Sequence, residues 1–197
     1  MYLKIKRSID IIVSIILFVI LLPIYIIIGL ILKLIGIKNI IFKQVRTGKD
    51  GKDFIIYKFT TMDENNNIPS FCMFLRKTGL DETPQLINII KGDMSIVGPR
   101  PWIKDYNKNF TKRQKRRLEV LPGLTGLAQT RNTDSVLEKI EYDIYYVDNI
   151  SLKMDIYVLF SSLSWILFGK KNEYSTSDIK DEIELLKKNK KGAKWKK

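Results

Sequence analysis

The N-terminal part of the chain holds the stretch that decides its architecture: IIVSIILFVILLPIYIIIGLIL, residues 11–32. No residue in this stretch carries a formal charge. A helix of this length, rising about 1.5 Å per residue, could just cross a hydrocarbon core of about 30 Å. The stretch therefore predicts a membrane segment. Pro23 lies in its middle, removes one helical hydrogen bond and presses on the preceding turn, so we expect the helix to bend there.

A secretory signal peptide is the competing interpretation, because basic residues precede the apolar run. The run is longer than a usual signal core, however, and no small-x-small cleavage site follows it. Basic residues flank it on both sides: Lys4, Lys6 and Arg7 before it, Lys33, Lys38 and Lys43 after it. Because positive residues favour the cytoplasmic side, we favour a re-entrant hairpin bent at Pro23 over a kinked single span. Asp10 is expected to pair with Arg7 or a neighbouring cation, or to be a solvated acid at the helix start.

Composition narrows the chemistry open to the rest of the chain. Its 197 residues suffice for one compact domain beside the anchor. The net charge of +13 indicates an anionic partner, whether nucleic acid, phosphorylated small molecules or an anionic leaflet. The chain has no histidine, which excludes Ser-His and Cys-His nucleophile pairs. Its one cysteine, Cys72, is expected to be a core residue. The chemistry must therefore use carboxylates, Arg, Lys and hydroxyls.

Several secondary-structure elements can be expected after the anchor. Residues 40–62 alternate around a glycine-containing turn, which predicts a β-hairpin, and the polar residues 63–67 predict a loop. Helical patterns cover residues 70–77, 82–91 and roughly 102–121, and the last of these carries a basic run read as a solvated face. Residues 156–168 are apolar but too short to span a membrane, so they predict a core or interface-lying helix. The Lys-rich residues 187–197 are expected to be disordered.

The first cluster that could carry chemistry is LDETPQL, residues 80–86. By itself it is best read as a helix start, because Asp is a preferred N-cap and Glu and Pro suit a first turn. A helix N-terminus also attracts phosphate, however, so a carboxylate at Asp81 would be directed at a phosphorus atom. Such a carboxylate is ionised at neutral pH and can act as a covalent nucleophile without a helper base.

Two further clusters could support such a carboxylate. In SIVGPRP, residues 95–101, Arg100 stands between two prolines that stiffen the turn presenting it. Its guanidinium can grip phosphate oxygens bidentately, as can that of Arg76, although ordinary surface ion pairs are the simpler interpretation. In PGLTGLAQ, residues 122–129, two glycines allow backbone to approach a ligand closely, or they merely form a turn.

Taken together, these motifs resemble the bacterial sugar transferase family of small monotopic phosphoglycosyl transferases. The motifs that carry the resemblance are, in chain order, KRSID (6–10), FKQVRTG (42–48), YKFTTM (57–62), LRKTGLDETPQL (75–86), GPRP (98–101), PGLTG (122–126) and SLKMD (151–155). The resemblance implies a reaction in two steps. The carboxylate of Asp81 attacks the β-phosphate of a UDP-sugar and UMP leaves, and polyprenyl (undecaprenyl) phosphate then attacks the aspartyl-phosphosugar intermediate.

The resemblance also assigns roles to individual residues. Asp81 and Glu82 become the catalytic pair and the expected ligands of a magnesium ion, which would neutralise the diphosphate. The phosphate- and substrate-binding positions that it implies are Arg76, Arg100, Gln44, Lys58 and Asp155. Two departures from the family pattern stand out: Leu22 replaces the Ser usually found before Pro23, and Thr60 replaces an Arg that usually precedes the Ser/Thr-Met pair.

The fold expected on this resemblance is α+β, with a re-entrant membrane helix hairpin over residues 1–38. A small, mainly helical catalytic domain follows over residues 39–175, with a short β-hairpin and interface-lying amphipathic helices, and residues 176–197 form a basic tail. The expected location is the bacterial inner membrane, with the domain on the cytoplasmic face. Two alternatives are an inactive membrane scaffold and a membrane-tethered nucleic-acid binder; with the transferase, no nucleic acid is expected. The sugar and the oligomeric state stay open, a homodimer being one candidate.

Overall fold

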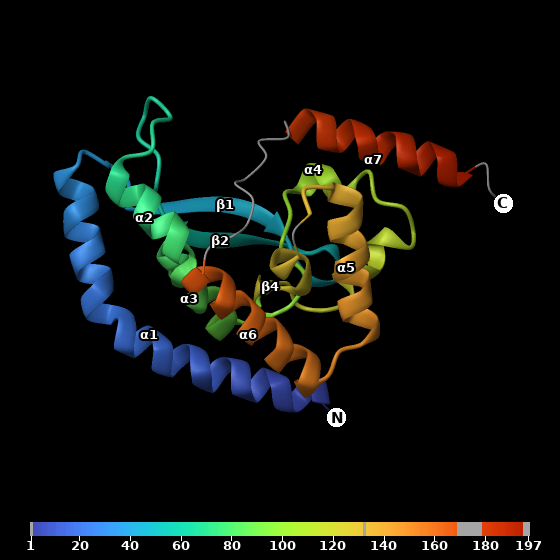
Figure 1. Ribbon diagram of the computed structural model, residues 1–197, viewed down its shortest axis with the longest axis horizontal. Coiled ribbons are helices and arrows are strands. Elements are labelled where there is room, and N and C mark those ends of the chain that lie inside the picture. Colours follow the sequence, from blue (N-terminus) through green and yellow to red (C-terminus); the bar gives the residue numbers. More distant parts are fainter. Residues whose placement is uncertain (1, 132, 169–178, 195–197) are drawn as a thin grey trace. The chain divides into compact units, whose positions relative to one another are not determined.

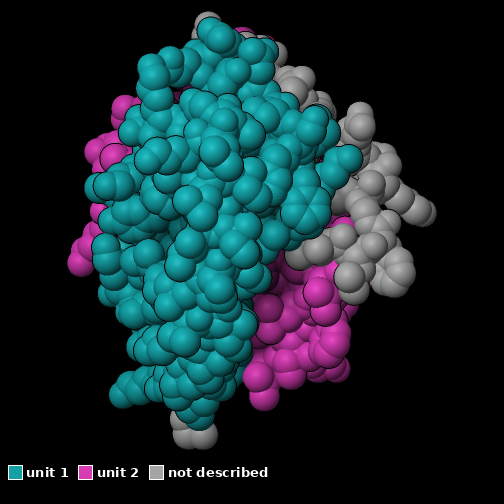
Figure 2. Space-filling model, turned by 90° about the vertical axis from the view of Figure 1, so that its left-hand side faces the viewer, with its two compact units in different colours: residues 1–44, 55–96 teal, residues 45–54, 97–197 magenta. Residues whose placement is uncertain are grey.

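The computed structural model describes residues 2–131, 133–168 and 179–194 (Figure 1). The chain divides into two compact units, one made of Met1–Gln44 and Ile55–Ile96, the other of Val45–Phe54 and Val97–Lys197 (Figure 2). It passes between them within a hairpin of β1 (Ile41–Thr47) and β2 (Asp53–Phe59), and again within β3 (Ser95–Val97), which pairs with β4 (Gly123–Thr125). These small sheets among helices confirm the expected mixture of α and β structure, and β1 and β2 confirm the predicted hairpin.

The apolar run forms α1 (Tyr2–Leu34), a continuous helix with Pro23 inside it. Figure 1 shows the axis of α1 turning part-way along its length, as expected for a helix that contains a proline. Among the described residues, α1 is the one helix long and apolar enough to cross a membrane, with a mean hydropathy of 3.3 in its most apolar window. Only 11% of that window is buried, whereas the core helix of a soluble protein would be mostly buried. The exposed apolar surface of α1 therefore fits contact with lipid.

Polar contacts fasten the N-terminal end of α1 to its own unit. The Asp10 carboxylate accepts a hydrogen bond from the Ser95 hydroxyl at 2.6 Å and lies 3.8 Å from the Lys6 ammonium, with both charged groups buried. Arg7 donates to the carbonyl of Met94 at 3.2 Å. The expected pairing of Asp10 with a neighbouring cation is thus confirmed for Lys6. Because Asp10 is buried, the alternative of a solvated acid is wrong.

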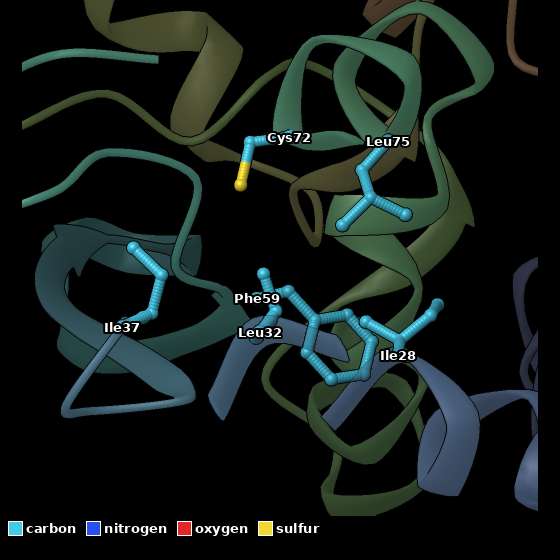
Figure 3. Close-up of a cluster of buried hydrophobic side chains, with 6 residues drawn as sticks. All are labelled: Ile28, Leu32, Ile37, Phe59, Cys72 and Leu75. Atoms are coloured by element: carbon cyan, nitrogen blue, oxygen red, sulfur yellow. The ribbon is translucent and has the colours of Figure 1, made fainter. Parts of the chain in front are cut away.

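The C-terminal half of α1 packs into a hydrophobic cluster (Figure 3) with α2 (Ser70–Thr78) and the end of β2. Its buried members are Ile28, Leu32, Ile37, Phe59, Cys72 and Leu75. Cys72 is buried in this cluster, as predicted for a core residue. The helix predicted over residues 70–77 is therefore confirmed as α2, which ends at Gly79 in the left-handed conformation that glycine adopts most easily.

The helix predicted over residues 82–91 is confirmed only in part. Residues Leu80–Gln85 form a 3-10 turn, η2, and the α-helix α3 covers only Leu86–Lys91. Pro84 lies inside η2 and cannot donate a backbone hydrogen bond. The acidic pair therefore lies on a tight turn between two helices.

The helix predicted over residues 102–121 is wrong. The second unit instead contains a short α4 (Lys104–Asn107) and a separate 3-10 turn, η3 (Gln114–Leu118). Thr111 and Gln114 exchange hydrogen bonds between side chain and backbone, at 2.8 and 3.2 Å. This reciprocal pattern is that of a capping box, which starts a new turn and does not prolong an old one.

The remaining helices of this unit are α5 (Val136–Asp148), α6 (Leu152–Phe168) and α7 (Ile179–Lys194), after a 3-10 turn, η4 (Leu127–Thr130). α6 extends the helix predicted over residues 156–168 by one turn. The disorder expected over residues 187–197 is wrong for 187–194, which are helical, because α7 has an apolar side that packs: Leu186 is fully buried beside Tyr106 and Phe110. Residues 176–178 and 195–197 of the expected tail lie outside the described residues.

Candidate active site

The acidic pair lies at the start of η2, but its aspartate is not the N-cap residue. Gly79 occupies the N-cap position and, as a glycine, has no side chain to make a capping hydrogen bond there. Asp81 is the second residue of the turn and only 7% exposed. The reading of Asp81 as a helix cap is therefore wrong, and its burial needs another explanation, because buried carboxylates are rare unless they have a function or a partner.

The surroundings of Asp81 disfavour its negative charge. Burial and, after it, the neighbouring Glu82 carboxylate raise the pKa of Asp81 to about 6. The positive charges of Lys58 and Arg76 act in the opposite direction, so both cations lie close enough to be felt at the carboxylate. At neutral pH Asp81 is still mostly ionised, and burial removes part of the water that would otherwise solvate it. A perturbed carboxylate of this kind is typical of a functional site.

The two cations near Asp81 are both held by neighbours. The Arg76 Nε donates to the Thr61 hydroxyl at 2.7 Å, which leaves the outer edge of an exposed guanidinium for other ligands. The Lys58 ammonium lies over the ring of Phe42, 5.1 Å from its centre. At the position where the family usually has Arg, the Thr60 hydroxyl donates to the backbone carbonyl of Asn39. Thr60 thus ties two chain segments together.

One side chain of the membrane helix reaches the acidic turn. The Tyr25 hydroxyl donates to the backbone carbonyl of Thr83 at 3.1 Å, and its ring packs edge-on against Phe18 and Phe59. α1 therefore helps to hold the turn that carries Asp81, a link that nothing in the local sequence pattern indicates.

In the second unit, the turn carrying Arg100 is fixed at four successive carbonyls. The carbonyl of Pro99 accepts from the backbone N–H of Gly123 at 3.0 Å, and that of Trp102 from the backbone N–H of Thr47 at 3.0 Å. Between them, side chains are the donors: Arg117 to the carbonyl of Arg100 at 2.6 Å and Arg46 to that of Pro101 at 3.3 Å. The exposed side chain of Arg100 is thus presented from a turn that is held throughout.

The glycines of residues 122–126 serve this same turn. A Cβ at Gly123 or Gly126 would collide with the backbone of Gly98, and one at Gly98 would collide with the carbonyl of Leu121. The N–H of Gly98 also donates to the carbonyl of Thr125 at 2.9 Å. The close approach that these glycines allow is therefore between two segments of the chain itself.

Sequence reasoning missed the support under Arg100. Within the basic run read as a solvated face, Arg117 is buried and pairs with the buried Asp143 at 2.7 Å. Its guanidinium also lies 4.4 Å from the centre of the Trp102 ring. Arg113 and Arg116 of the same run are the ones that face outward, to exposed carboxylates. No spacing rule distinguishes the inward arginine from its neighbours.

Of the remaining predicted positions, Asp155 is buried, and its carboxylate lies 2.6 Å from the Tyr146 hydroxyl, which can donate to it. This contact gives Asp155 a packing role. Gln44 is half-buried in β1. The first unit contains most of the predicted site residues: Gln44, Lys58, Arg76, Asp81 and Glu82. The second unit contains Arg100 and Asp155.

The acidic pair is compatible with a magnesium ion. Among the described residues no group of three metal-ligating side chains occurs. Magnesium bound for phosphate chemistry, however, commonly takes one or two protein carboxylates and completes its shell with water and substrate phosphates. The Glu82 charge destabilises ionised Asp81, and a cation beside the pair would relieve that repulsion. Two adjacent carboxylates on a tight turn therefore fit this ion.

A long exposed apolar helix and, in the same unit, a buried carboxylate near two cations fit a membrane-associated protein that binds phosphate groups. The family model "Bacterial sugar transferase" matches residues 1–169. The chain belongs to this family.

Relatives with assigned names carry the comparison further. The chain is 44% identical over 144 residues to the uncharacterized sugar transferase EpsL of Bacillus subtilis (strain 168), covering 66% of this chain and 71% of that protein. It is 33% identical over 189 residues to the UDP-N-acetylgalactosamine-undecaprenyl-phosphate N-acetylgalactosaminephosphotransferase of Aeromonas hydrophila, covering 85% and 45% of the two chains. It is 36% identical over 178 residues to the UDP-glucose:undecaprenyl-phosphate glucose-1-phosphate transferase of Klebsiella pneumoniae, covering 79% and 38%.

The match thus spans less than half the length of the last two relatives. Their names share one lipid acceptor, undecaprenyl phosphate, and differ in the sugar. Similarity to them therefore indicates a reaction class and leaves the sugar open.

Proposed function

We propose that this protein transfers a sugar phosphate from a UDP-sugar to polyprenyl phosphate, with the Asp81 carboxylate as the covalent nucleophile. The observation that carries the proposal is a buried aspartate that is not the N-cap of its turn and that feels two positive charges nearby. The names of the relatives supply the substrate classes.

In the first step an Asp81 carboxylate oxygen attacks the β-phosphorus of the UDP-sugar. The bond between that phosphorus and the oxygen bridging to the α-phosphorus breaks, and UMP leaves. In the second step a phosphate oxygen of polyprenyl phosphate attacks the same phosphorus. The bond to Asp81 breaks, which regenerates the carboxylate and yields a polyprenyl diphosphosugar. One carboxylate thus serves as nucleophile in one step and leaving group in the next.

Attack by one anion on another requires positive charge, which this chain supplies from fixed side chains. Arg76, steadied by Thr61, and Lys58 would hold phosphate oxygens near Asp81. Arg100 is proposed to bind phosphate from its fixed turn. We propose Gln44 and Asp155 as further substrate-binding positions on the resemblance alone.

Asp81 and Glu82 would hold a magnesium ion together with the diphosphate. When bound, this ion would neutralise charge on the diphosphate oxygens. The protein's part is to keep the two carboxylates adjacent on η2 and to exclude water from Asp81, which is largely buried.

We further propose that α1 is re-entrant in the bacterial inner membrane, with both ends and the catalytic residues on the cytoplasmic side. The proline in α1 and the turn of its axis support this topology (Figure 1). So do the basic residues at both ends, which favour the cytoplasmic face. A membrane-embedded acceptor such as polyprenyl phosphate requires a site beside the bilayer, which this anchor would supply.

The test is UMP release from a panel of UDP-sugars in detergent with polyprenyl phosphate and magnesium. Wild-type protein should release UMP with one or a few sugars, and Asp81→Asn should lose at least about a thousandfold in rate, because the amide cannot act as the nucleophile. Asp134→Asn removes a carboxylate from an exposed position and should keep full activity. Undiminished UMP release by Asp81→Asn would refute the covalent mechanism and would show that the Asp81 carboxylate takes no part in the reaction.

A further inference from the structure

Arg131 is held in an unusual way in the second unit. It follows η4 directly, and its side chain is exposed. Its guanidinium carbon lies 5.5 Å from the ring centre of Tyr142 on α5 and 5.7 Å from that of Tyr157 on α6. Two aromatic rings from different helices thus hold one cation by cation–π attraction.

Among the described residues, no acidic side chain pairs with the Arg131 guanidinium. Arg113, Arg116 and Arg117 of the same unit each pair with an acidic side chain. The Arg131 side chain contacts the two rings, while its backbone N–H donates to the carbonyl of Ala128. Aromatic rings do not neutralise the charge of a guanidinium, so its N–H donors can still bind an anion.

The surface next to this arginine is apolar. On α6, beside Tyr157, large hydrophobic side chains project outward at helical spacing: Leu152, Ile156, Leu159, Phe160 and Leu163, of which Phe160 is 70% exposed. The inward side of the same helix carries the buried Asp155 and Val158. An exposed apolar stripe of this size on one helix fits the boundary between lipid headgroups and acyl chains.

We propose that Arg131, which contacts Tyr142 and Tyr157, binds the phosphate of a membrane lipid whose chains lie along the apolar stripe of α6. Tyrosines suit the headgroup depth because the ring is apolar and the hydroxyl polar. A guanidinium at that depth matches a phosphate, which it can hold by two parallel hydrogen bonds. The lipid is either the acceptor, polyprenyl phosphate, or a bulk phospholipid, and only the first option rests on the proposed function.

The experiment measures lipid retention by native mass spectrometry in a detergent without phosphate. Polyprenyl phosphate and phosphatidylglycerol are added in separate arms, and inorganic phosphate at equal concentration serves as a competitor. Arg131→Gln removes the charge, Arg131→Lys keeps it but loses the bidentate fork, and Arg113→Gln is the matched control. Unfolding midpoints of all variants confirm that they fold.

Arg131→Gln should reduce retention of at least one lipid about tenfold, Arg131→Lys less, and Arg113→Gln hardly at all. Loss confined to polyprenyl phosphate would identify the site as the acceptor's, and loss for both lipids would identify a general lipid-phosphate site. Equal effects of Arg131→Gln and Arg113→Gln, or displacement of the lipid by inorganic phosphate alone, would overturn the proposal. Because retention needs no turnover, a chain that binds lipid through Arg131 without releasing UMP would contradict only the proposed function.

Discussion

At the scale of single residues, the ionised carboxylate of Asp81 lowers the stability of the folded chain at neutral pH. A carboxylate with a pKa of about 6 in the folded chain, against about 4 when unfolded, binds its proton more tightly in the folded state. Its raised pKa therefore stabilises the fold below about pH 4, and this contribution is lost as the pH rises through 6. Ionised Asp81 thus burdens the folded chain at neutral pH, as expected of a residue kept for chemistry.

We therefore predict that Asp81→Asn raises the unfolding midpoint at pH 7.5 while abolishing activity. The gain should correspond to about 1–3 kcal/mol, since a pKa shift of one unit equals about 1.4 kcal/mol. It should shrink towards zero below about pH 4, where wild-type Asp81 is protonated too. Thermal unfolding in magnesium-free detergent measures this difference. A lower unfolding midpoint for Asp81→Asn than for wild type at pH 7.5 would contradict this prediction and would indicate that the Asp81 carboxylate stabilises the turn.

At the scale of elements, the turn that carries Arg100 is built by segments far away in the sequence. Gly123 packs against Gly98, and Arg117 donates to the carbonyl of Arg100. Neither Gly98 nor Gly123 has a positive φ. Glycine is required at these positions because the two backbone segments approach each other closely. The turn should therefore be sensitive to changes more than fifteen residues away.

Gly123→Ala is predicted to lower the unfolding midpoint and the activity together, because the added Cβ would push the backbone of Gly98 away. The cost should be about 1–3 kcal/mol, as for overpacking elsewhere. Gly29→Ala is the control, since a Cβ there would meet only the Ile40 side chain at 3.8 Å. Thermal unfolding compares the two. Equal midpoints for both variants would show that the 98–123 contact is loose.

The buried ion pair gives a sharper test of how Arg100 is positioned. Arg117→Met alone should cost about 3–5 kcal/mol, because it leaves Asp143 charged and unpaired, whereas Arg117→Met with Asp143→Leu should recover most of that stability. In both variants the carbonyl of Arg100 loses its donor. The KM for the UDP-sugar should therefore stay raised in the stable double variant.

The same ion-pair change is then repeated in an Arg100→Ala background. If Arg117 acts through Arg100, it should raise the KM no further there. A further, additive increase would assign Arg117 a purely structural role.

The elements that sequence reasoning predicted are those with local signals. The β-hairpin has alternation and a glycine turn, and α2 has a helical pattern followed by Gly79. The helix over residues 102–121 failed because the Thr111–Gln114 capping box breaks it and because Arg117 turns inward to a carboxylate 26 residues away. Such long-range pairing leaves no trace in local periodicity. The acidic pair, Arg76 and Arg100 could be named from motif order, whereas their supports, Thr61, Arg117 and Gly123, emerged only in three dimensions.

At the scale of the whole molecule, we propose that α1 is both an anchor and a part of the site. Tyr25 links α1 to the acidic turn, Arg7 links it to the carbonyl of Ile90 in α3, and Asp10 links it to Ser95 in β3. Each link lies inside the first unit. A helix fixed in this way would hold Asp81 at a set depth relative to the lipid.

The re-entrant topology predicts that both ends of α1 stay on the cytoplasmic side. Cysteines introduced by Tyr2→Cys or Lys38→Cys should resist an impermeant thiol reagent in intact cells and react in inverted vesicles. Native Cys72 is fully buried and should give little background. Labelling of Tyr2→Cys from the periplasm would establish a kinked single span in place of the hairpin.

In the proposed mechanism Asp81 carries the phosphosugar between the two steps. The most direct test of this mechanism is the intact mass of the protein after incubation with the active UDP-sugar and magnesium, without polyprenyl phosphate. We predict a mass increase equal to one sugar phosphate on Asp81, which disappears when polyprenyl phosphate is added and does not form in Asp81→Asn. UMP release in proportion to protein with no adduct, or an adduct that persists in Asp81→Asn, would contradict it.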